Sequence, residues 1–363
     1  NPKWLLECLR KTDLTIRPIW LTRNRLVLRF LKSRNIEAYY AYSLRGYLYS
    51  ARAKVGIVSA GIFDINRFVV PPILVNTWHG TPMKKVGKEF LSYRRERDNS
   101  LLGRVEMIVR TVFAGFDPFY KLVPNEQYKL FTANSETEAR LLRESFGPIR
   151  VEVTGQPRLD VFFGRLNEFG ESLGHKKLIL YLPTHRFEGK KRMVPKILDG
   201  LVDIDDILER VGAEMYIKLH AFHQYENRDL KNGLHCARNI HVIADEQILG
   251  DIYPILAQAD ILITDYSSVY IDYLVTRRPV IFFPFDIDEY MKYERQFNFE
   301  YDEITPGPKC STWDCVAHWI ERMLANPEYY KDERERVMSI FHTYHDGNNC
   351  KRVVNAIRRI LSE

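Results

Sequence analysis

The feature that most constrains the fold is a series of short apolar runs, each long enough for one buried strand. In Val280–Phe283, four apolar residues follow one another without a polar interruption. Such a run is typical of a strand buried on both faces, as in a parallel sheet covered by helices. Segments with a helical pattern separate the runs. This alternation predicts an α/β fold with parallel sheets.

The expected strands form two series. The first is Arg17–Trp20, Ala38–Tyr42, Val55–Ser59, Ile73–Asn76, Tyr128–Ala133 and Val151–Thr154, and the second is Lys177–Tyr181, Glu214–Leu219, Ile240–Ile243, Ile261–Thr264 and Pro279–Phe283. Expected helices include Ser135–Glu144, Met193–Arg210, Glu333–His342 and Arg352–Leu361. Ser135 with Glu138 three residues later forms a capping box, which marks the start of the first of these helices.

Two domains are expected, because 363 residues are too many for one compact core. The stretch 164–177 is polar, contains glycine and has little apolar periodicity, so it is the best candidate linker. We therefore expect an N-terminal domain of residues 1–164 and a C-terminal domain of residues 165–363. We leave open whether the last helix packs back on the first domain.

Composition narrows the class of protein. Hydrophobic residues make up 45% and charged residues 28%, as in ordinary globular proteins. No apolar run approaches the roughly 20 residues that cross a bilayer, and no signal peptide is visible, so we expect a cytoplasmic location. The five cysteines are scattered and none forms a Cys-x-x-Cys pair. We expect them to be reduced, and we predict neither a disulfide framework nor a zinc site.

The net charge of +6 is unevenly distributed. Residues 10–34 are rich in arginine and lysine and contain a single acidic residue, Asp13, and residues 84–97 form a second basic stretch. Such surfaces bind anionic lipid, phosphorylated substrates or nucleic acid. A solvated basic face is the structural alternative. No nucleic-acid-binding motif accompanies the charge, so we expect no nucleic acid partner.

A histidine motif, Trp78–Lys84, follows the expected strand Ile73–Asn76 directly. Loops at strand ends carry much of the chemistry of α/β proteins. An imidazole titrates near neutral pH and can exchange a proton with a hydroxyl, so His79 is a candidate catalytic base. A single loop histidine is more often structural. The polar motifs at other strand ends favour the catalytic interpretation.

A second motif combines a buried strand, Ile261–Thr264, with two serines and the start of a helix. Helix N-termini offer unpaired N–H groups and a positive dipole end, to which Ser267 and Ser268 would add hydroxyl groups. The pattern predicts a phosphate or pyrophosphate site, and a plain serine N-cap is the structural alternative. Asp265 and Asp272 are candidates to orient the loop or to bind a ribose hydroxyl.

Other strand ends carry weaker signals. His220 is a candidate charge stabiliser or a histidine bonded to a backbone carbonyl. Arg186 suits bidentate phosphate binding, with a salt bridge as an equal alternative. Asp286–Asp288 is similar to an Asp-x-Asp metal signature, but so short an acidic pattern is frequent by chance, and we expect no metal. Gly-x-Gly-x-x-Gly and P-loop motifs are absent from the sequence.

Five motifs, taken in order, resemble those of the CDP-glycerol glycerophosphotransferases, which are teichoic acid polymerases and primases with relatives in capsule synthesis. They are Trp78–Lys84, Gly155–Asp160, Lys218–His220, Thr264–Ser268 and Arg278–Phe283. The resemblance covers nearly the whole chain. It implies a GT-B fold, in which two Rossmann-like domains face each other across a central cleft. It also implies transfer of a polyol phosphate from a CDP-activated donor to an acceptor hydroxyl, with release of CMP and without a required metal or cofactor.

The resemblance also assigns site residues. His79 matches the proposed catalytic base of the family, and His220 matches its second essential histidine. The donor-binding candidates are Ser267, Ser268, Thr264, Asp272 and Arg186. Lys84 and Lys85, which follow His79 closely, are the acceptor-binding candidates.

Two departures from the family pattern leave questions open. Family members often carry a tryptophan where this chain has His185, which leaves the contacts to the donor head group open. They also usually have a further N-terminal segment, often membrane-associated, before the position of Asn1. A single module of a larger polymerase is therefore one reading of this chain.

We predict a glycerophosphotransferase at the inner face of a bacterial membrane, with an anionic membrane surface as a partner. Its acceptor would be a phosphopolyol or a lipid-linked saccharide. Three alternatives stay open: a CDP-ribitol donor, a nucleotide-sugar glycosyltransferase of the same fold, and a non-catalytic module that binds membranes through its basic stretches. The sequence does not decide between addition of one unit and of many.

Overall fold

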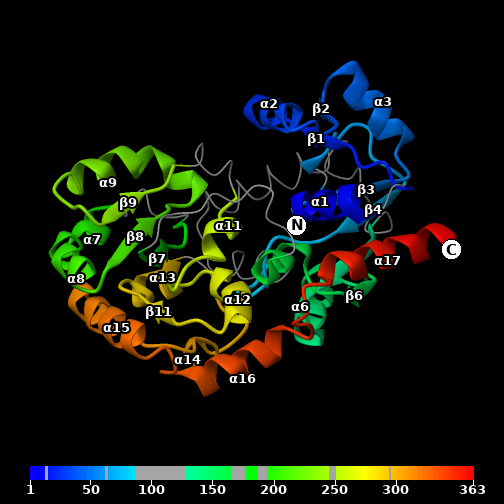
Figure 1. Ribbon diagram of the computed structural model, residues 1–363. Helices are drawn as coiled ribbons and strands as arrows, with labels where there is room; N and C mark the ends of the chain where they lie inside the picture. Colours follow the sequence, from blue (N-terminus) through cyan, green and yellow to red (C-terminus); the bar gives the residue numbers. More distant parts are fainter. Residues whose placement is uncertain are drawn as a thin grey trace, which may run out of the picture. The chain divides into compact units, whose positions relative to one another are not determined.

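The computed structural model describes residues 1–12, 15–61, 64–86, 128–164, 176–186, 194–244, 251–293 and 296–363. The chain divides into two compact units (Figure 1). The first is Asn1–Leu166 together with Phe341–Glu363, and the second is Asn167–Ile340. Both contain parallel sheets with helices, so the predicted α/β class is confirmed. The C-terminal segment Phe341–Glu363 belongs to the first unit, and it contains the last helix, for which the sequence leaves this placement open.

The first unit is built on a parallel sheet of order β3-β4-β5-β6. Its strands are β3 (Val55–Val58), β4 (Ile73–Asn76), β5 (Tyr128–Ala133) and β6 (Val151–Val153). A separate parallel pair consists of β1 (Trp20–Thr22) and β2 (Ala38–Tyr40). The expected strand Arg17–Trp20 is misplaced, because pairing with β2 begins only at Trp20, opposite Ala38.

Helices α1 (Pro2–Thr12), α2 (Arg25–Ser33), α3 (Leu44–Arg52), α6 (Glu136–Phe146) and α17 (Asn349–Ser362) belong to this unit. The expected N-cap of α6 is confirmed, since the Glu138 N–H donates to Ser135 Oγ over 3.3 Å. The Glu138 carboxylate instead accepts the N–H of Asn134, at 2.6 Å. The capping box is therefore displaced by one residue.

The Gly155–Asp160 motif fastens the C-terminal segment to the first unit. It leads into the 3-10 helix η3 (Pro157–Phe163), which contacts both α1 and α17. The Asp160 carboxylate accepts the N–H groups of Asn349 and Cys350 at 3.0 and 2.8 Å and so caps α17. Gly155 has φ +72°, and a Cβ there would lie 1.9 Å from Asn349 Oδ1. Only glycine fits this position.

The second unit holds a parallel sheet of order β11-β10-β7-β8-β9. The strands are β7 (Lys177–Leu182), β8 (Ala213–Ile217), β9 (Ile240–Val242), β10 (Ile261–Thr264) and β11 (Val280–Phe282). The chain starts at the central β7, moves outward to β9 and then returns to build β10 and β11 on the other side. This is the doubly wound order, and its topological switch point lies between β7 and β10.

Helices of the second unit include α7 (Val194–Leu198), α8 (Asp205–Arg210), α9 (Asn227–Gly233), α12 (Val269–Tyr273), α13 (Ile287–Tyr293), α15 (Trp313–Ala325) and α16 (Lys331–Phe341). The expected single helix Met193–Arg210 is wrong. Gly200 takes φ +82°, a left-handed conformation that ends α7, and a 3-10 turn, η4 (Val202–Ile204), separates it from α8. Among the helices of the described residues, none is long and apolar enough to cross a membrane.

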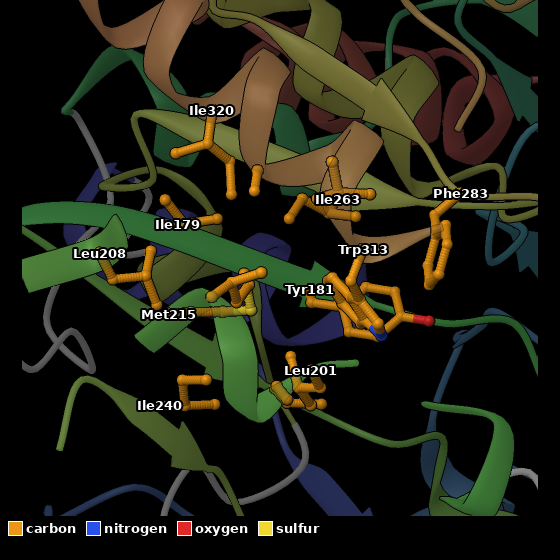
Figure 2. Packing of buried hydrophobic residues seen from close by; sticks show 14 of the residues in the cluster. Ile179, Tyr181, Leu201, Leu208, Met215, Ile240, Ile263, Phe283, Trp313 and Ile320 are labelled. Atoms are coloured by element: carbon orange, nitrogen blue, oxygen red, sulfur yellow. The ribbon is translucent and has the colours of Figure 1, made fainter. Parts of the chain in front are cut away.

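A hydrophobic cluster of the second unit lies between one face of its sheet and helices that include α7, α8 and α15 (Figure 2). Ile179, Met215 and Ile263 from the strands pack with Trp313 and Ile320 from the helix, all at most 2% exposed. The Trp313 indole N–H also donates to the carbonyl of Ile197 over 2.7 Å, which ties α15 to α7. Burial of these apolar side chains is the main source of stability of this layer.

The prediction that all five cysteines are reduced is wrong for one pair. Cys310 and Cys315 form a disulfide at the beginning of α15. Their Cα atoms are 5.5 Å apart, within the range that a disulfide needs. Their separation of five residues matches none of the usual cysteine motifs, so the sequence pattern carried no signal for this bond.

Candidate functional site

The loops that follow β7 and β10 meet at the switch point of the second unit. β7 and β10 are directly paired, and the Asp265 carboxylate after β10 accepts the N–H of Thr184 after β7, at 2.9 Å. The same carboxylate accepts the N–H of Tyr266 at 2.6 Å. Ligands of doubly wound sheets bind beyond the carboxyl ends of the strands at this point. The structure therefore brings Pro183–Arg186 and Asp265–Ser268 together where a ligand is expected.

Arg186 is buried and paired with two carboxylates. Its Nη2 lies 2.9 Å from Asp265 and 2.8 Å from Asp286, and its Nε donates to Asp286 over 3.0 Å. The guanidinium also lies over the rings of Tyr266 and Tyr290, at 4.9 and 5.0 Å from their centroids. Burial lowers the Arg186 pKa, but the two carboxylates outweigh this effect and raise the pKa above its ordinary value.

This pairing joins the ends of three strands, because Asp265 follows β10 and Asp286 follows β11. Of the two sequence interpretations, the structure contains the salt bridge. Arg186 Nη1 also donates to the Thr184 carbonyl over 2.6 Å, so most donors of the guanidinium are engaged within these loops. Asp286, the first residue of the Asp-x-Asp pattern, is engaged in the same pair.

Ser267 and Ser268 are half-buried at the start of α12. Ser267 Oγ accepts the N–H of Val269 over 3.3 Å, and Ser268 makes no side-chain cap. α12 has only five residues, so its dipole is small and anion binding there would depend mainly on the hydroxyls and the first N–H groups.

The other two residues of this motif are buried. Thr264 Oγ1 donates to the Leu182 carbonyl at 2.7 Å, a bond between β10 and β7. The Asp272 carboxylate accepts from the hydroxyl of Tyr253 at 2.5 Å. Both interactions hold the elements around the two serines in place.

Three imidazole rings lie in a row after β7 and β8. His220 is exposed, and its ring centroid lies 5.2 Å from that of His185, which lies 4.8 Å from that of His223. His223 is 2% exposed, with Nδ1 2.7 Å from Glu226. Its Nε2 accepts the Arg186 backbone N–H at 3.4 Å, so Nδ1 carries the proton.

The sequence interpretation included His220 but missed His223 and Glu226. Their spacing of three residues within 220–226, directly after a buried strand, is a signal that was available. The spacing places side chains on the same side of a helical turn.

His79 lies in the first unit, directly beyond the end of β4. Its ring is exposed, and Nδ1 lies 3.3 Å from the carbonyl oxygen of Ser59, which follows the neighbouring strand β3. A carbonyl only accepts, so Nδ1 is the protonated nitrogen of the neutral ring and Nε2 is the basic one. The His79 ring also packs on Trp78, at 4.3 Å between centroids.

Lys84 and Lys85 follow in the same loop and are half-buried. The rest of the second basic stretch, from residue 87 to residue 97, lies outside the described residues. The predicted site residues thus divide between the units: His79, Lys84 and Lys85 belong to the first, and His220 with the donor-binding candidates belongs to the second.

Comparison with known proteins gives a family match over almost the whole chain. A family model described as CDP-Glycerol:Poly(glycerophosphate) glycerophosphotransferase matches residues 1–359. The teichoic acid glycerol-phosphate transferase of Staphylococcus aureus is 24% identical over 98% of this chain and 89% of its own length. The teichoic acid poly(glycerol phosphate) polymerase of Staphylococcus epidermidis is also 24% identical, over 80% of this chain. The poly(ribitol-phosphate) polymerase of Bacillus spizizenii is 29% identical over 64% of this chain.

This chain spans only 39% of the Staphylococcus epidermidis polymerase and 38% of the Bacillus spizizenii polymerase. Among solved structures, a variant of the wall teichoic acid polymerase TagF soaked with CDPG has a TM-score of 0.70 and 20% identity, over 99% of this chain and 85% of that one. The Staphylococcus aureus MnaA–UDP structure has a TM-score of 0.55 and 14% identity, over 100% and 94%. These likenesses confirm the predicted GT-B type of fold.

Replacement of Arg186 by methionine is expected to destabilise the second unit by roughly 3–5 kcal/mol, because it leaves the buried Asp265 carboxylate and the largely buried Asp286 carboxylate without their cation. Urea unfolding of the full chain measures this loss. The matched control is Arg210→Met, which removes an exposed ion pair with Glu321 and should cost about 1 kcal/mol or less. If Arg186→Met were as stable as the control but bound nucleotide more weakly, Arg186 would be a donor ligand rather than a structural cation.

Proposed function

Because this chain belongs to the CDP-glycerol:poly(glycerophosphate) glycerophosphotransferase family, we propose that it transfers a polyol phosphate from a CDP-activated donor to an acceptor hydroxyl and releases CMP. The observation that carries this proposal is the Asp265–Ser268 loop at the switch point of the second unit, where two half-buried serines follow a buried strand. A pyrophosphate bound there would receive bonds from the two hydroxyls and the first N–H groups of α12.

Glycerol phosphate is the group we favour, because the family description names it and this chain spans most of a glycerol-phosphate transferase. Ribitol phosphate is the alternative, since a poly(ribitol-phosphate) polymerase is also a relative. The acceptor would be a phosphopolyol or a lipid-linked saccharide, with Lys84 and Lys85 as its anion-binding residues. The reaction we propose requires no metal.

His79 acts as the general base in this proposal. The Ser59 carbonyl holds the proton on Nδ1, so Nε2 takes the proton of the acceptor hydroxyl. The acceptor oxygen forms a bond to the phosphorus that carries the polyol, and the bond from this phosphorus to the oxygen of CMP breaks in line. The negative charge that develops on CMP is stabilised by Ser267, Ser268 and His220.

Arg186 has an indirect role in this mechanism. Its carboxylate partners keep it within the loop framework, so it positions the serine loop through Asp265. Thr264 and Asp272 act in the same way, through their bonds to Leu182 and Tyr253. The direct donor contacts are therefore assigned to Ser267 and Ser268.

CDP-glycerol and CDP-ribitol, offered separately with short phosphopolyol acceptors in buffer containing EDTA, provide the first test. We expect CMP release with CDP-glycerol as the preferred donor. Ser267→Ala with Ser268→Ala should weaken CDP binding by about tenfold or more in calorimetry, since each lost bond to a charged group is worth about 1.5–3 kcal/mol. Ser339→Ala, at an exposed helical serine of the same unit, is the control.

Each other outcome of this assay has a defined meaning. Release of UDP or GDP from a nucleotide sugar would favour a glycosyltransferase. Unchanged CDP affinity in the double serine variant would remove the pyrophosphate site from the proposal. Activity that disappears with EDTA and returns with a divalent cation would contradict a metal-independent reaction.

Replacement of His79 by alanine should lower kcat by about 10²–10⁴-fold, the usual contribution of a general base, while donor affinity is retained. His235→Ala is the matched control, because His235 is also exposed and its Nδ1 also lies against a backbone carbonyl, that of Asn232, at 2.8 Å. Steady-state rates of CMP release measure both variants. Near-normal turnover of His79→Ala would remove the base assignment.

We also propose an anionic membrane surface as a partner of the first unit. α2 and α3 both pack on β2 and carry exposed apolar side chains, with Leu26 56%, Leu44 91% and Leu48 50% exposed. Basic residues accompany them along both helices, among them Arg25, Arg29, Lys32, Arg45 and Arg52. Apolar side chains flanked by arginine and lysine are typical of helices that lie in a lipid interface.

Sedimentation with vesicles tests this surface. We expect binding to vesicles that contain phosphatidylglycerol and much weaker binding to pure phosphatidylcholine. Leu44→Glu with Leu48→Glu should reduce binding roughly tenfold or more, because each apolar side chain that enters the interface contributes about 1.5–3 kcal/mol when fully buried. Leu361→Glu, at an exposed leucine of α17, is the control, and equal losses for both would rule out this surface.

A further inference from the structure

Trp78, the residue before His79, has an unusual backbone conformation. Its φ is +49°, in the left-handed region that a bulky side chain rarely occupies. Such a conformation is strained and persists only where the surroundings impose it. The contacts that impose this conformation on Trp78 therefore also determine the position of His79.

The backbone groups around Trp78 are bonded on every side. The Asn1 side-chain amide donates from Nδ2 to the carbonyls of Thr77 and Trp78 at 2.8 and 2.7 Å. The Trp78 N–H donates to Asn76 Oδ1 at 2.8 Å. The Trp78 ring packs in a buried cluster with Phe131 and Phe146. Asn1 thus contacts the two carbonyls that precede His79.

Asn1 is itself held in one orientation. Its Oδ1 accepts the N–H of Arg158 at 3.1 Å, and its Nδ2 lies 3.0 Å from Gln156 Oε1. Gln156 is fully buried, and its Nε2 donates to the Thr132 carbonyl at 2.8 Å, which fixes its Oε1 toward Asn1. A flipped amide at either position would place oxygen against oxygen, so only one orientation of each side-chain amide satisfies the hydrogen bonds.

We propose that Asn1 and Gln156 are positioning residues for His79. Asn1 holds the Thr77 and Trp78 carbonyls, and Gln156 holds Asn1. Together they fix the left-handed bend that brings His79 Nδ1 to the Ser59 carbonyl. Without them Trp78 relaxes to an ordinary φ, the imidazole loses the bond that sets its tautomer, and Nε2 no longer lies where the acceptor proton is. This inference rests on the proposed role of His79 as the base.

Asn1→Asp is the variant that isolates this role. It keeps the size of the side chain and the acceptor for the Arg158 N–H. In place of the donor Nδ2, however, it puts an oxygen against the three oxygen atoms that now accept from Nδ2. A displacement of about 1 Å at a reacting group can cost 10²-fold, so we expect kcat to fall about 10–100-fold with donor KM within about twofold.

The matched control is Asn66→Asp. Asn66 is also buried in the first unit, and its Nδ2 also donates to a carbonyl, that of Ala41 at 2.8 Å, while its Oδ1 accepts the N–H of Phe68. We expect a comparable fall in melting temperature and a kcat within about twofold of the parent. Gln156→Leu, which loosens Asn1 without removing it, should lower kcat in the same direction but by less.

The pH dependence separates positioning from general destabilisation. A carboxyl group that faces three acceptor oxygens has a raised pKa, and once protonated it again donates a hydrogen bond. The ratio of Asn1→Asp kcat to parent kcat should therefore rise as the pH falls from about 8 to about 5.5. The same ratio for Asn66→Asp should stay flat.

A direct measurement keeps this inference distinct from the base assignment. The His79 ring signals, identified by NMR through their absence in His79→Ala, should shift in Asn1→Asp and stay in place in Asn66→Asp. This readout holds even if His79→Ala turns out to be active. Unmoved His79 signals in Asn1→Asp, or a kcat loss no larger than that of Asn66→Asp, would overturn the proposal.

Discussion

The paired charges of Arg186, Asp265 and Asp286 are the interaction on which the second unit depends. An unpaired charge in this buried place would cost several kcal/mol, so each of the three groups requires the others. The three residues follow β7, β10 and β11. Their two ion pairs therefore determine how the loops at the carboxyl edge of the sheet meet. The serine loop therefore rests on an electrostatic framework rather than on its own short helix.

The first unit places its chemistry by a different means. There the His79 loop is held by neutral amides and carbonyls, with Asn1 and Gln156 at the centre and a tryptophan ring packed beneath. In a network of neutral amides each hydrogen bond has a defined direction, since exchanging a donor with an acceptor would break hydrogen bonds. One unit thus fixes its loops by charge and the other by the direction of hydrogen bonds.

Much of this architecture could be predicted from apolar periodicity. Ile73–Asn76 and Tyr128–Ala133 form strands with the predicted bounds, because both are apolar segments at the centre of a sheet. The helix over Met193–Arg210 failed at Gly200, where one backbone angle overrides a continuous apolar pattern. The His79 and serine loops follow β4 and β10, as the strand-end motifs predicted, and their chemical roles stay predictions. The partners of Arg186 and the contacts of Asn1 were not predictable, because they join residues from 76 to 157 positions apart that only the fold brings together. The His223–Glu226 pair is local, and its spacing of three residues was a signal that the sequence interpretation missed.

The return of Phe341–Glu363 to the first unit has a consequence for biosynthesis. During translation, domains usually fold in the order in which they emerge. Here the second unit is a continuous stretch and can complete its sheet first, whereas the first unit lacks α17 until residues 349–362 have been synthesised. Until then the Asp160 carboxylate has no helix to cap and the face that covers α17 is open to solvent. The first unit begins earlier in the sequence than the second and therefore finishes folding after it.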